Sequence, residues 1–354
     1  MAILSRPLLA LGLTLALAFG AASPSRADSA ALLAQAQKND ATRYAAMQAK
    51  GAEIRATSDG LSFSLWWQPA GWTAGAGVIV ALHGHDGYAT TEAALWQPSA
   101  EKHGHALLTL QWWFGSGEAT SDYYRPDQMY PLIAALLAAK GVRPGTVMFT
   151  GYSRGAANSY ATAVLDNTTS AAHYFGFVLS NAGGALANYP PNQQITAGAF
   201  GSRPFGAMKW GLYCGEKDPD PDQSGCPAMR AARDWVQQYG ASVALFIDDA
   251  SGDHGGFMTN SANVETALAT YASLLPGAET ECLLDWAEDR FPTVLSPRRA
   301  TTQLSAPYSY RSYAATRTSV GVSAADQHVW LLDAAGVLTD LGPAANWSAQ
   351  AGCR

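Results

Sequence analysis

The sequence predicts an α/β fold, a doubly wound and mostly parallel sheet, followed by a small β-rich module at the C-terminal end. Between residues 61 and 247 the chain contains short, nearly continuous apolar runs, which are typical of strands buried on both faces of a parallel sheet. Helix-length stretches separate these runs, and strands that alternate with helices indicate a doubly wound sheet. The alternation stops near Pro276-Gly277, after which short runs with Tyr and Trp alternate with turn residues.

The individual elements follow from these patterns. Residues 29–57 are rich in alanine and predict a helical segment at the N-terminal side. The first expected strand, Leu61–Trp67, alternates as a half-buried strand does. The other expected strands are Gly77–Leu82, Ala106–Leu110, Thr146–Thr150, Phe175–Leu179, Met208–Tyr213 and Ser242–Ile247. The expected helices cover about 88–103, 127–140, 154–165, 226–239 and 261–275, and a short one covers Glu281–Glu288.

The first 27 residues have the pattern of an export signal. Arg6 supplies a positive charge, Leu8–Phe19 is an apolar run, and Ser25–Ala27 ends in a small residue. A membrane anchor would need about 20 apolar residues, so we expect a signal peptide in residues 1–27 that is cleaved after Ala27. The mature protein is then periplasmic or extracellular, without a membrane span. We expect an α/β domain over residues 28–277 and the small module over 278–354.

Composition excludes several classes of protein. Hydrophobic residues make up 48% of the 354 residues and charged residues 14%, which excludes a disordered chain and a coiled coil. The net charge is −6, and no run of Lys or Arg offsets it. A nucleic-acid partner is therefore not expected, because such binding needs a cationic surface.

Export makes the four cysteines candidates for disulfide bonds. Four cysteines allow three pairings, and their positions favour Cys214–Cys226 and Cys282–Cys353. Loop closure by these bonds is worth about 3 and about 4 to 5 kcal/mol, respectively. The spacing does not match a zinc site, and the sequence lacks a phosphate-binding G-x-x-x-x-G-K-[ST] loop. We expect no metal and no cofactor.

The motif Gly151-Tyr152-Ser153-Arg154-Gly155 matches G-x-S-x-G. It follows an expected strand and precedes an expected helix, which is the context of a nucleophile elbow. The two glycines allow a turn too tight for larger side chains, and this turn exposes the Ser153 hydroxyl. The alternative is a glycine-rich turn with an ordinary serine. We interpret Ser153 as a nucleophile.

A serine hydroxyl needs a base to take its proton, and in a nucleophile-elbow fold the base follows the serine in the chain. His173, His254 and His328 lie downstream of Ser153. His254 follows the last expected core strand within a glycine-containing loop, whereas His173 precedes a middle strand and His328 lies in the C-terminal module. His254 is therefore the expected base.

The acid that orients the base should follow the preceding strand. Asp218, in Tyr213-Cys-Gly-Glu-Lys-Asp218, lies at that position and would accept the Nδ1 hydrogen of the histidine. Glu216, Asp220 and Asp222 are alternatives in the same loop. The expected Cys214–Cys226 bond would hold this loop, although it could equally serve only the stability of an exported protein.

An ester or amide reaction also needs hydrogen-bond donors for the oxyanion. One is the backbone N–H of Arg154, directly after the nucleophile. The segment His83-Gly84-His85-Asp86-Gly87 follows an early strand and offers the backbone N–H of His85 as the second donor. The alternative for this segment is a plain glycine-rich turn, with His83 as a structural hydrogen-bonding residue.

Trp112 and Trp113 end the expected strand Ala106–Leu110 and its extension. Sites in open α/β sheets lie at the carboxyl ends of strands, so this pair could bind an aromatic or oligomeric acyl group. Packing in the core is an equal alternative, because tryptophan is mostly buried.

Together these motifs resemble the α/β-hydrolase superfamily over roughly residues 60–275. The His-Gly-x-x-Gly, Gly-Tyr-Ser-Arg-Gly, Cys-Gly-x-x-Asp and Asp-His-Gly segments resemble those of secreted bacterial esterases of the polyhydroxybutyrate-depolymerase and feruloyl-esterase type. The resemblance implies hydrolysis of esters through an acyl-enzyme. By motif, the nucleophile, acid, base and oxyanion donors are Ser153, Asp218, His254, His85 and Arg154. The Trp112-Trp113 pair departs from the patterns of named subfamilies.

Two other functions compete with the ester hydrolase that this resemblance implies. A serine peptidase of the same fold would use the same three side chains, although the sequence lacks an N-terminal segment large enough to be a gating propeller. A non-catalytic protein could instead bind a polymer or cell surface through the aromatic residues of 280–354. The substrate is expected to be an ester, with polymeric esters among the candidates, and the oligomeric state is left open.

Overall fold

The computed structural model describes residues 28–275 except 171, 186–188 and 207, and parts of the C-terminal region: 284, 287, 300–305, 308–313, 316–323, 328–344 and 346–347. The expected signal peptide lies outside the described residues. So do Cys282 and Cys353, and with them the second expected disulfide.

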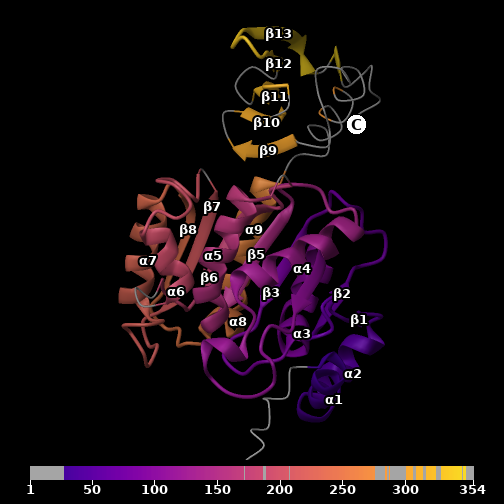
Figure 1. Ribbon diagram of the computed structural model, residues 1–354, viewed down its shortest axis with the longest axis vertical. Helices are drawn as coiled ribbons and strands as arrows, with labels where there is room; N and C mark the ends of the chain where they lie inside the picture. Colours follow the sequence, from indigo (N-terminus) through magenta and orange to yellow (C-terminus); the bar gives the residue numbers. More distant parts are fainter. Residues whose placement is uncertain are drawn as a thin grey trace, which may run out of the picture.

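An eight-stranded sheet forms the centre of the α/β unit (Figure 1), with strand order β1-β2-β4-β3-β5-β6-β7-β8. The strands are β1 (Glu53–Ala56), β2 (Phe63–Trp67), β3 (Val78–Leu82), β4 (Ala106–Leu110), β5 (Val147–Tyr152), β6 (Phe175–Asn181), β7 (Lys209–Gly215) and β8 (Ser242–Asp249). β1 pairs with β2 and β2 with β4 in antiparallel register, and all other neighbours are parallel. The predicted doubly wound, mostly parallel sheet is confirmed.

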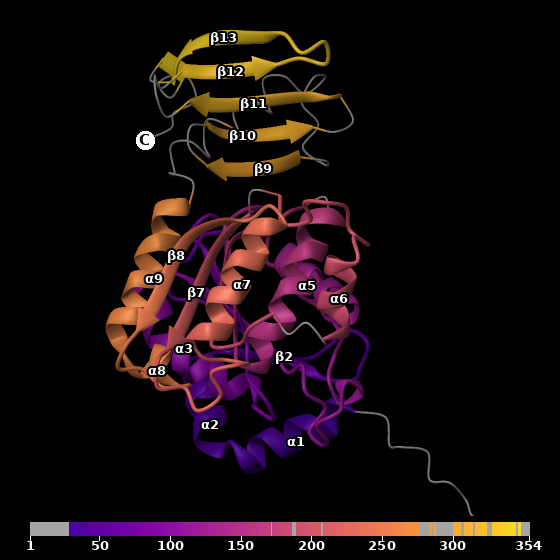
Figure 2. The same ribbon diagram turned by 90° about the vertical axis from the view of Figure 1, so that its left-hand side faces the viewer.

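Helices cover both faces of this sheet. The helices are α1 (Ser29–Asn39), α2 (Ala41–Ala49), α3 (Ala89–His103), α4 (Pro126–Ala139), α5 (Arg154–Thr168), α6 (Pro190–Thr196), α7 (Cys226–Gln238), α8 (Gly256–Thr259) and α9 (Ser261–Leu274). α4, α5 and α7 pack on one face, and α3, α8 and α9 pack on the other (Figures 1 and 2). The short helices α6 and α8 and the 3₁₀ turn Thr120–Asp122 were not predicted.

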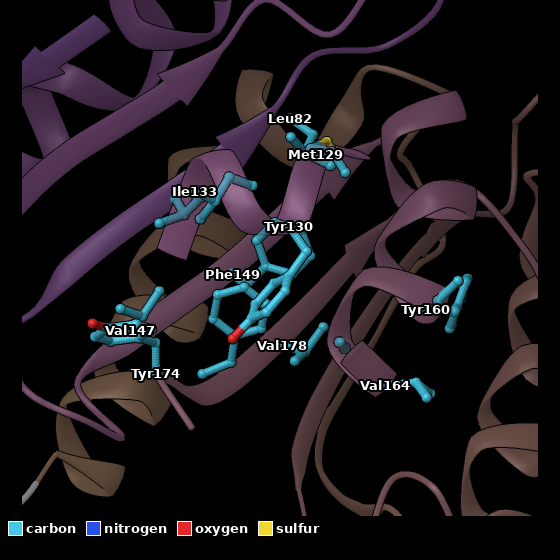
Figure 3. Packing of buried hydrophobic residues seen from close by; sticks show 14 of the residues in the cluster. Leu82, Met129, Tyr130, Ile133, Val147, Phe149, Tyr160, Val164, Tyr174 and Val178 are labelled. Atoms are coloured by element: carbon cyan, nitrogen blue, oxygen red, sulfur yellow. The ribbon is translucent and has the colours of Figure 1, made fainter. Parts of the chain in front are cut away.

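The buried strands explain the continuous apolar runs of the sequence. Every residue of Val78–Leu82 in β3 is fully buried, because alternate side chains enter the two opposite helix layers. Figure 3 shows one layer, in which Tyr130 and Ile133 of α4 lie against the strand residues Val147 and Phe149. Side chains on both faces must therefore be apolar.

Three predicted elements differ from the structure. The helical prediction for residues 29–57 is wrong beyond Ala49, because Gly51 adopts a φ of 79° and Glu53–Ala56 then pairs with β2. β2 is buried along its whole length rather than half-buried, since Phe63 packs under the N-terminal helices. β8 is an edge strand and is only partly buried.

A separate five-stranded antiparallel sheet lies in the C-terminal part (Figure 1), in the order β13-β12-β11-β10-β9. Its strands are β9 (Ala300–Ser305), β10 (Tyr308–Tyr313), β11 (Thr318–Ser323), β12 (His328–Leu332) and β13 (Leu338–Pro343). Tyr313, Val320, Val322 and Val329 form its core together with Leu284. The predicted β-rich module is confirmed. None of the helices in the described part of the chain is long and apolar enough to cross a membrane.

Candidate active site

Ser153, Asp218 and His254 lie at the carboxyl ends of three parallel strands. Ser153 directly follows β5, Asp218 follows β7 by three residues, and His254 follows β8 by five. Parallel strands bring their carboxyl ends to one edge of the sheet. Residues that are 36 and 101 positions apart thereby meet.

Ser153 occupies a tight turn between β5 and α5. Its φ of 54° and ψ of −118° lie in a region that costs a non-glycine residue about 1–3 kcal/mol. A side chain at Gly151 would collide with the carbonyl of Gly155, and one at Gly155 would come within 2.6 Å of the carbonyl oxygen of His83. Both glycines of the motif are thus required by close packing. The Ser153 N–H donates to the carbonyl of Asn181 at 2.8 Å, which holds the turn against β6.

His254 connects the other two side chains by hydrogen bonds. Its Nδ1 lies 2.7 Å from Oδ2 of Asp218, and its Nε2 lies 2.9 Å from Oγ of Ser153. A carboxylate can only accept a hydrogen bond, so Nδ1 carries the proton and donates it. Nε2 is then an acceptor for the Ser153 hydroxyl, and the arrangement can remove a proton from the serine.

Asp218 is held on its other oxygen. Oδ1 accepts from the N–H of Asp220 at 2.9 Å and from the hydroxyl of Ser224 at 2.9 Å. The Asp218 side chain is 1% exposed. The disulfide between Cys214 and Cys226 closes the loop that contains Asp218, so the predicted first disulfide is present.

The alternative carboxylates of this loop have other partners or face solvent. Glu216 pairs with Arg230, Asp220 accepts from a neighbouring glutamine at 2.6 Å, and Asp222 is exposed. Of these four carboxylates, Asp218 is the one that hydrogen-bonds His254.

The loop carrying His254 is fixed by Asp249, a residue that sequence reasoning did not identify. The Asp249 carboxylate accepts from the backbone N–H groups of Ser251 and Gly252 at 3.0 and 2.9 Å, and from the amide of Asn263 at 2.8 Å. These hydrogen bonds lower the pKa of Asp249 to about 2, and the bond from Asn263 has the largest effect. An Asp at a strand end followed by Ala-Ser-Gly is the sequence signal of such a turn.

The other candidate histidines are placed elsewhere. His173 lies ahead of β6, at the opposite edge of the sheet from Ser153. His328 pairs with Asp340 in the C-terminal sheet, with 2.8 Å between Nδ1 and the carboxylate. His83 is buried, which lowers its pKa to about 4, and its Nδ1 lies 2.8 Å from the carbonyl of Gly84.

His85 and Arg154 line the same cleft as Ser153. A Cβ at Gly84 would lie 3.3 Å from Cβ of Ser153, so the His83–Gly87 segment passes directly beside the serine. Within the described residues, no group accepts a hydrogen bond from the backbone N–H of His85 or of Arg154. The two N–H groups that the sequence predicts as oxyanion donors thus have no protein acceptor in the described part of the chain.

Trp112 and Trp113 are buried, with exposed fractions of 1% and 8%. The indole N–H of Trp112 donates to the carbonyl of His83 at 2.9 Å, and that of Trp113 donates to the carbonyl of Gly117 at 3.0 Å. Neither is among the described residues that line the cleft. Packing, rather than contact with an acyl group, accounts for this pair.

The cleft in front of Ser153 has a volume of about 410 Å³. Its described lining residues are His85, Thr120, Ser153, Arg154, Ala157, Ala182, Gly183, Gly184, Tyr189, Asp218, Pro219, Asp220, Gln223, Ser224 and His254. This set lacks Leu, Ile, Val, Phe and Met. Among the described residues, Cys214, Cys226 and Asp248 bring three potential metal-ligating atoms close together, but the two sulfurs form a disulfide and are not thiolate ligands.

Three observations decide the fold class: the strand order, the antiparallel β2, and the order of the three site residues along the chain. Ser153 follows β5, Asp218 follows β7 and His254 follows β8. The fold is an α/β-hydrolase fold. No protein-family model and no curated protein matches the sequence.

Solved structures with a similar chain path include a putative dienelactone hydrolase from Klebsiella pneumoniae (10% identity, TM-score 0.48, covering 62% of this chain and 98% of that one). A phospholipase/carboxylesterase from Dyadobacter fermentans (17%, 0.41, 59% and 95%) and an esterase from Pyrobaculum calidifontis (12%, 0.45, 64% and 85%) are further examples.

Proposed function

We propose that this α/β-hydrolase-fold protein is a carboxylic ester hydrolase that works through an acyl-enzyme on Ser153. The observation that carries the proposal is the continuous hydrogen-bonded chain from the Ser153 hydroxyl through His254 to the buried Asp218, at the edge of a cleft. A serine whose only role was structural would need neither a base nor a strained turn.

In the first step Oγ of Ser153 attacks the ester carbonyl carbon while Nε2 of His254 takes the hydroxyl proton. The oxygen of the tetrahedral intermediate becomes negative, and the N–H groups of His85 and Arg154 donate to it. Asp218 stays ionised, accepts the Nδ1 hydrogen and stabilises the imidazolium. His254 then gives its proton to the leaving alcohol oxygen, and the carbon–oxygen bond breaks.

In the second step the acyl-enzyme is hydrolysed. Water enters the space left by the alcohol, Nε2 of His254 takes one of its protons, and the resulting hydroxide attacks the acyl carbon. The second tetrahedral intermediate collapses when Nε2 returns a proton to Oγ of Ser153. The products are one carboxylic acid and one alcohol, and the serine is restored.

We also propose that the reaction takes place outside the cytoplasm. The export-signal pattern of residues 1–27 and the disulfide between Cys214 and Cys226 support this location. We further propose that the mature chain has two domains, the α/β domain over residues 28–277 and the small C-terminal module over residues 278–354. The motif resemblance makes polyesters and feruloyl esters the substrates to test after simple esters.

Hydrolysis of p-nitrophenyl esters from acetate to decanoate tests the proposal. Turnover should fall on the order of 10⁴- to 10⁶-fold in Ser153→Ala with an unchanged circular dichroism spectrum. His328→Gln serves as the matched control for His254→Gln and should leave turnover intact. We expect the shortest chains to react fastest, because the described lining lacks large aliphatic side chains.

Labelling of Ser153 by a fluorophosphonate separates catalysis from the alternatives. A wild-type protein that neither turns over esters nor reacts with the reagent would refute the proposal and favour a binding protein. Faster cleavage of peptide amides than of matched esters would favour the peptidase.

A further inference from the structure

The guanidinium of Arg154 is held beside the cleft by two contacts. Its Nη2 donates to the backbone carbonyl of Glu118 at 2.7 Å. Its Cζ lies 4.2 Å from the ring centroid of Tyr123, a distance typical of a cation–π contact. Arg154 is partly buried and lines the cleft with Ser153 and Thr120. The guanidinium is thus placed, rather than left to move freely in solvent.

This cation has no carboxylate partner within the described part of the chain. Five other arginines do have one: Arg43, Arg55, Arg125, Arg230 and Arg233. The hydrogen-bond acceptor that the structure gives Arg154 is a neutral carbonyl. A guanidinium has five N–H donors in a planar fork that fits a carboxylate. Arg154 therefore keeps donors for an anionic group.

The described lining of the cleft contains groups of both charges. Tyr189 lines the cleft with Arg154 and donates to Oδ1 of Asn158 at 2.7 Å. Burial raises the pKa of Tyr189 to about 12, and the charge of Arg154 opposes that rise. Two carboxylates also line the cleft, and both accept hydrogen bonds from protein groups: Asp218 from His254, and Asp220 from Gln223. Among the charged side chains of the lining, Arg154 is thus the group that can attract an anion.

We propose that Arg154 binds a carboxylate of the substrate, so that the preferred substrates are esters that also carry a free carboxylate. This inference rests on the proposed ester hydrolysis at Ser153. The carboxylate could belong to the acyl part, as in a hemiester of a dicarboxylic acid, or to the alcohol part, as in an ester of a hydroxy acid. Both sources offer the same chemistry to the guanidinium, because Ser153 and Arg154 face one cleft.

The test compares charged and neutral substrates of the same shape. On the acyl side the pair is the p-nitrophenyl ester of glutaric acid and that of its monoamide. On the alcohol side the pair is the acetate of 4-hydroxybenzoate and that of 4-hydroxybenzamide. The ratio of kcat/KM for the charged over the neutral substrate is measured within each enzyme. A change at the backbone N–H of Arg154 affects kcat/KM for both substrates equally, so it does not alter this ratio.

We expect Arg154→Gln to lower this ratio about tenfold or more on one of the two arms, which corresponds to about 1.4 kcal/mol. Arg154→Lys should restore part of the preference, because the charge returns without the planar fork. Arg233→Gln is the matched control, since Arg233 pairs with Asp234 away from the cleft, and its ratio should equal that of the wild type. Added salt should lower the wild-type ratio.

An unchanged ratio in Arg154→Gln on both arms would overturn the inference about Arg154. Turnover of the neutral esters in that same experiment would still support the proposed ester hydrolysis. If the wild type hydrolyses no ester, the proposed function fails, and binding to Ser153→Ala then decides the matter. Calorimetric titration with monomethyl glutarate and dimethyl glutarate should show tighter binding of the anion, and Arg154→Gln should remove that difference. Equal binding of both compounds would also overturn the inference.

Discussion

Glu92 is a buried carboxylic acid of the α/β unit. It lies on α3 and is 4% exposed. Among the described residues, its hydrogen-bond partner is the indole N–H of Trp96, at 2.9 Å. Burial raises the pKa of Glu92 to about 7, and the bond from Trp96 only partly opposes this rise. The charge of Glu92 also contributes to raising the pKa of Tyr152. The ring centroid of Tyr152 lies 5.1 Å from that of His254.

The change Glu92→Gln keeps the shape of the side chain and an acceptor for Trp96 but removes the ionisation. A rise in pKa from 4.5 to about 7 corresponds to about 3 kcal/mol. The folded protein binds this proton more tightly than the unfolded chain, so the contribution of Glu92 to stability is fully present below pH 4.5 and is lost as the pH rises through 7. Burial also raises the pKa of Asp166 to about 6. Asp166 changes the stability of the variant and of the wild type equally, so it does not affect the difference between their free energies of unfolding.

Urea denaturation followed by tryptophan fluorescence between pH 4 and pH 8 measures this difference. At pH 4 the Glu92→Gln variant and the wild type should have similar free energies of unfolding. At pH 8 the variant should be more stable by about 3 kcal/mol. Parallel stability curves over this range would refute the reasoning, since they would mean that Glu92 titrates alike in both states.

Two further predictions concern the loops that carry the proposed acid and base. Asp249→Ala should lower kcat about 10²-fold, because a small misplacement of His254 is costly. Asp248→Ala is the matched control, and an Asp249→Ala enzyme with the kcat of the wild type would contradict a positioning role. Replacement of Cys214 and Cys226 by Ser should lower the free energy of unfolding by about 3 kcal/mol, as measured in urea. Equal midpoints with and without the disulfide would contradict this estimate.

Much of the site was predictable because its residues follow strands. The G-x-S-x-G motif lies between a strand and a helix, so its context could be recognised in the sequence. His254 and Asp218 follow the strands where the base and acid of such a fold belong, and the structure connects both to Ser153. The sequence could not exclude Asp220, because the direction in which each carboxylate of a loop points depends on its partners. Ser224 is one of those partners.

Other features were out of reach because they depend on tertiary packing. An aromatic pair at a strand end can face solvent or the core, and only the surrounding structure buries Trp112 and Trp113. Alanine-rich composition favoured helix for residues 53–56, although the left-handed Gly51 ends the helical segment and Ile54 pairs with Leu65. Neither result could be read from local propensity.

The three loops of the site are each fixed by contacts of their own. Close packing of Gly151 and Gly155 holds the serine turn, Ser224 and the disulfide hold the acid loop, and Asp249 holds the histidine loop. The hydrogen bonds among the three side chains therefore need not assemble the site, and the geometry exists before a substrate arrives. Arg154 is different, because its backbone takes part in the serine turn while its charge has no carboxylate partner among the residues that the structure describes. Because a fixed cation at a preformed site selects among substrates by charge, the same residue that follows the proposed nucleophile is where we expect specificity to be decided.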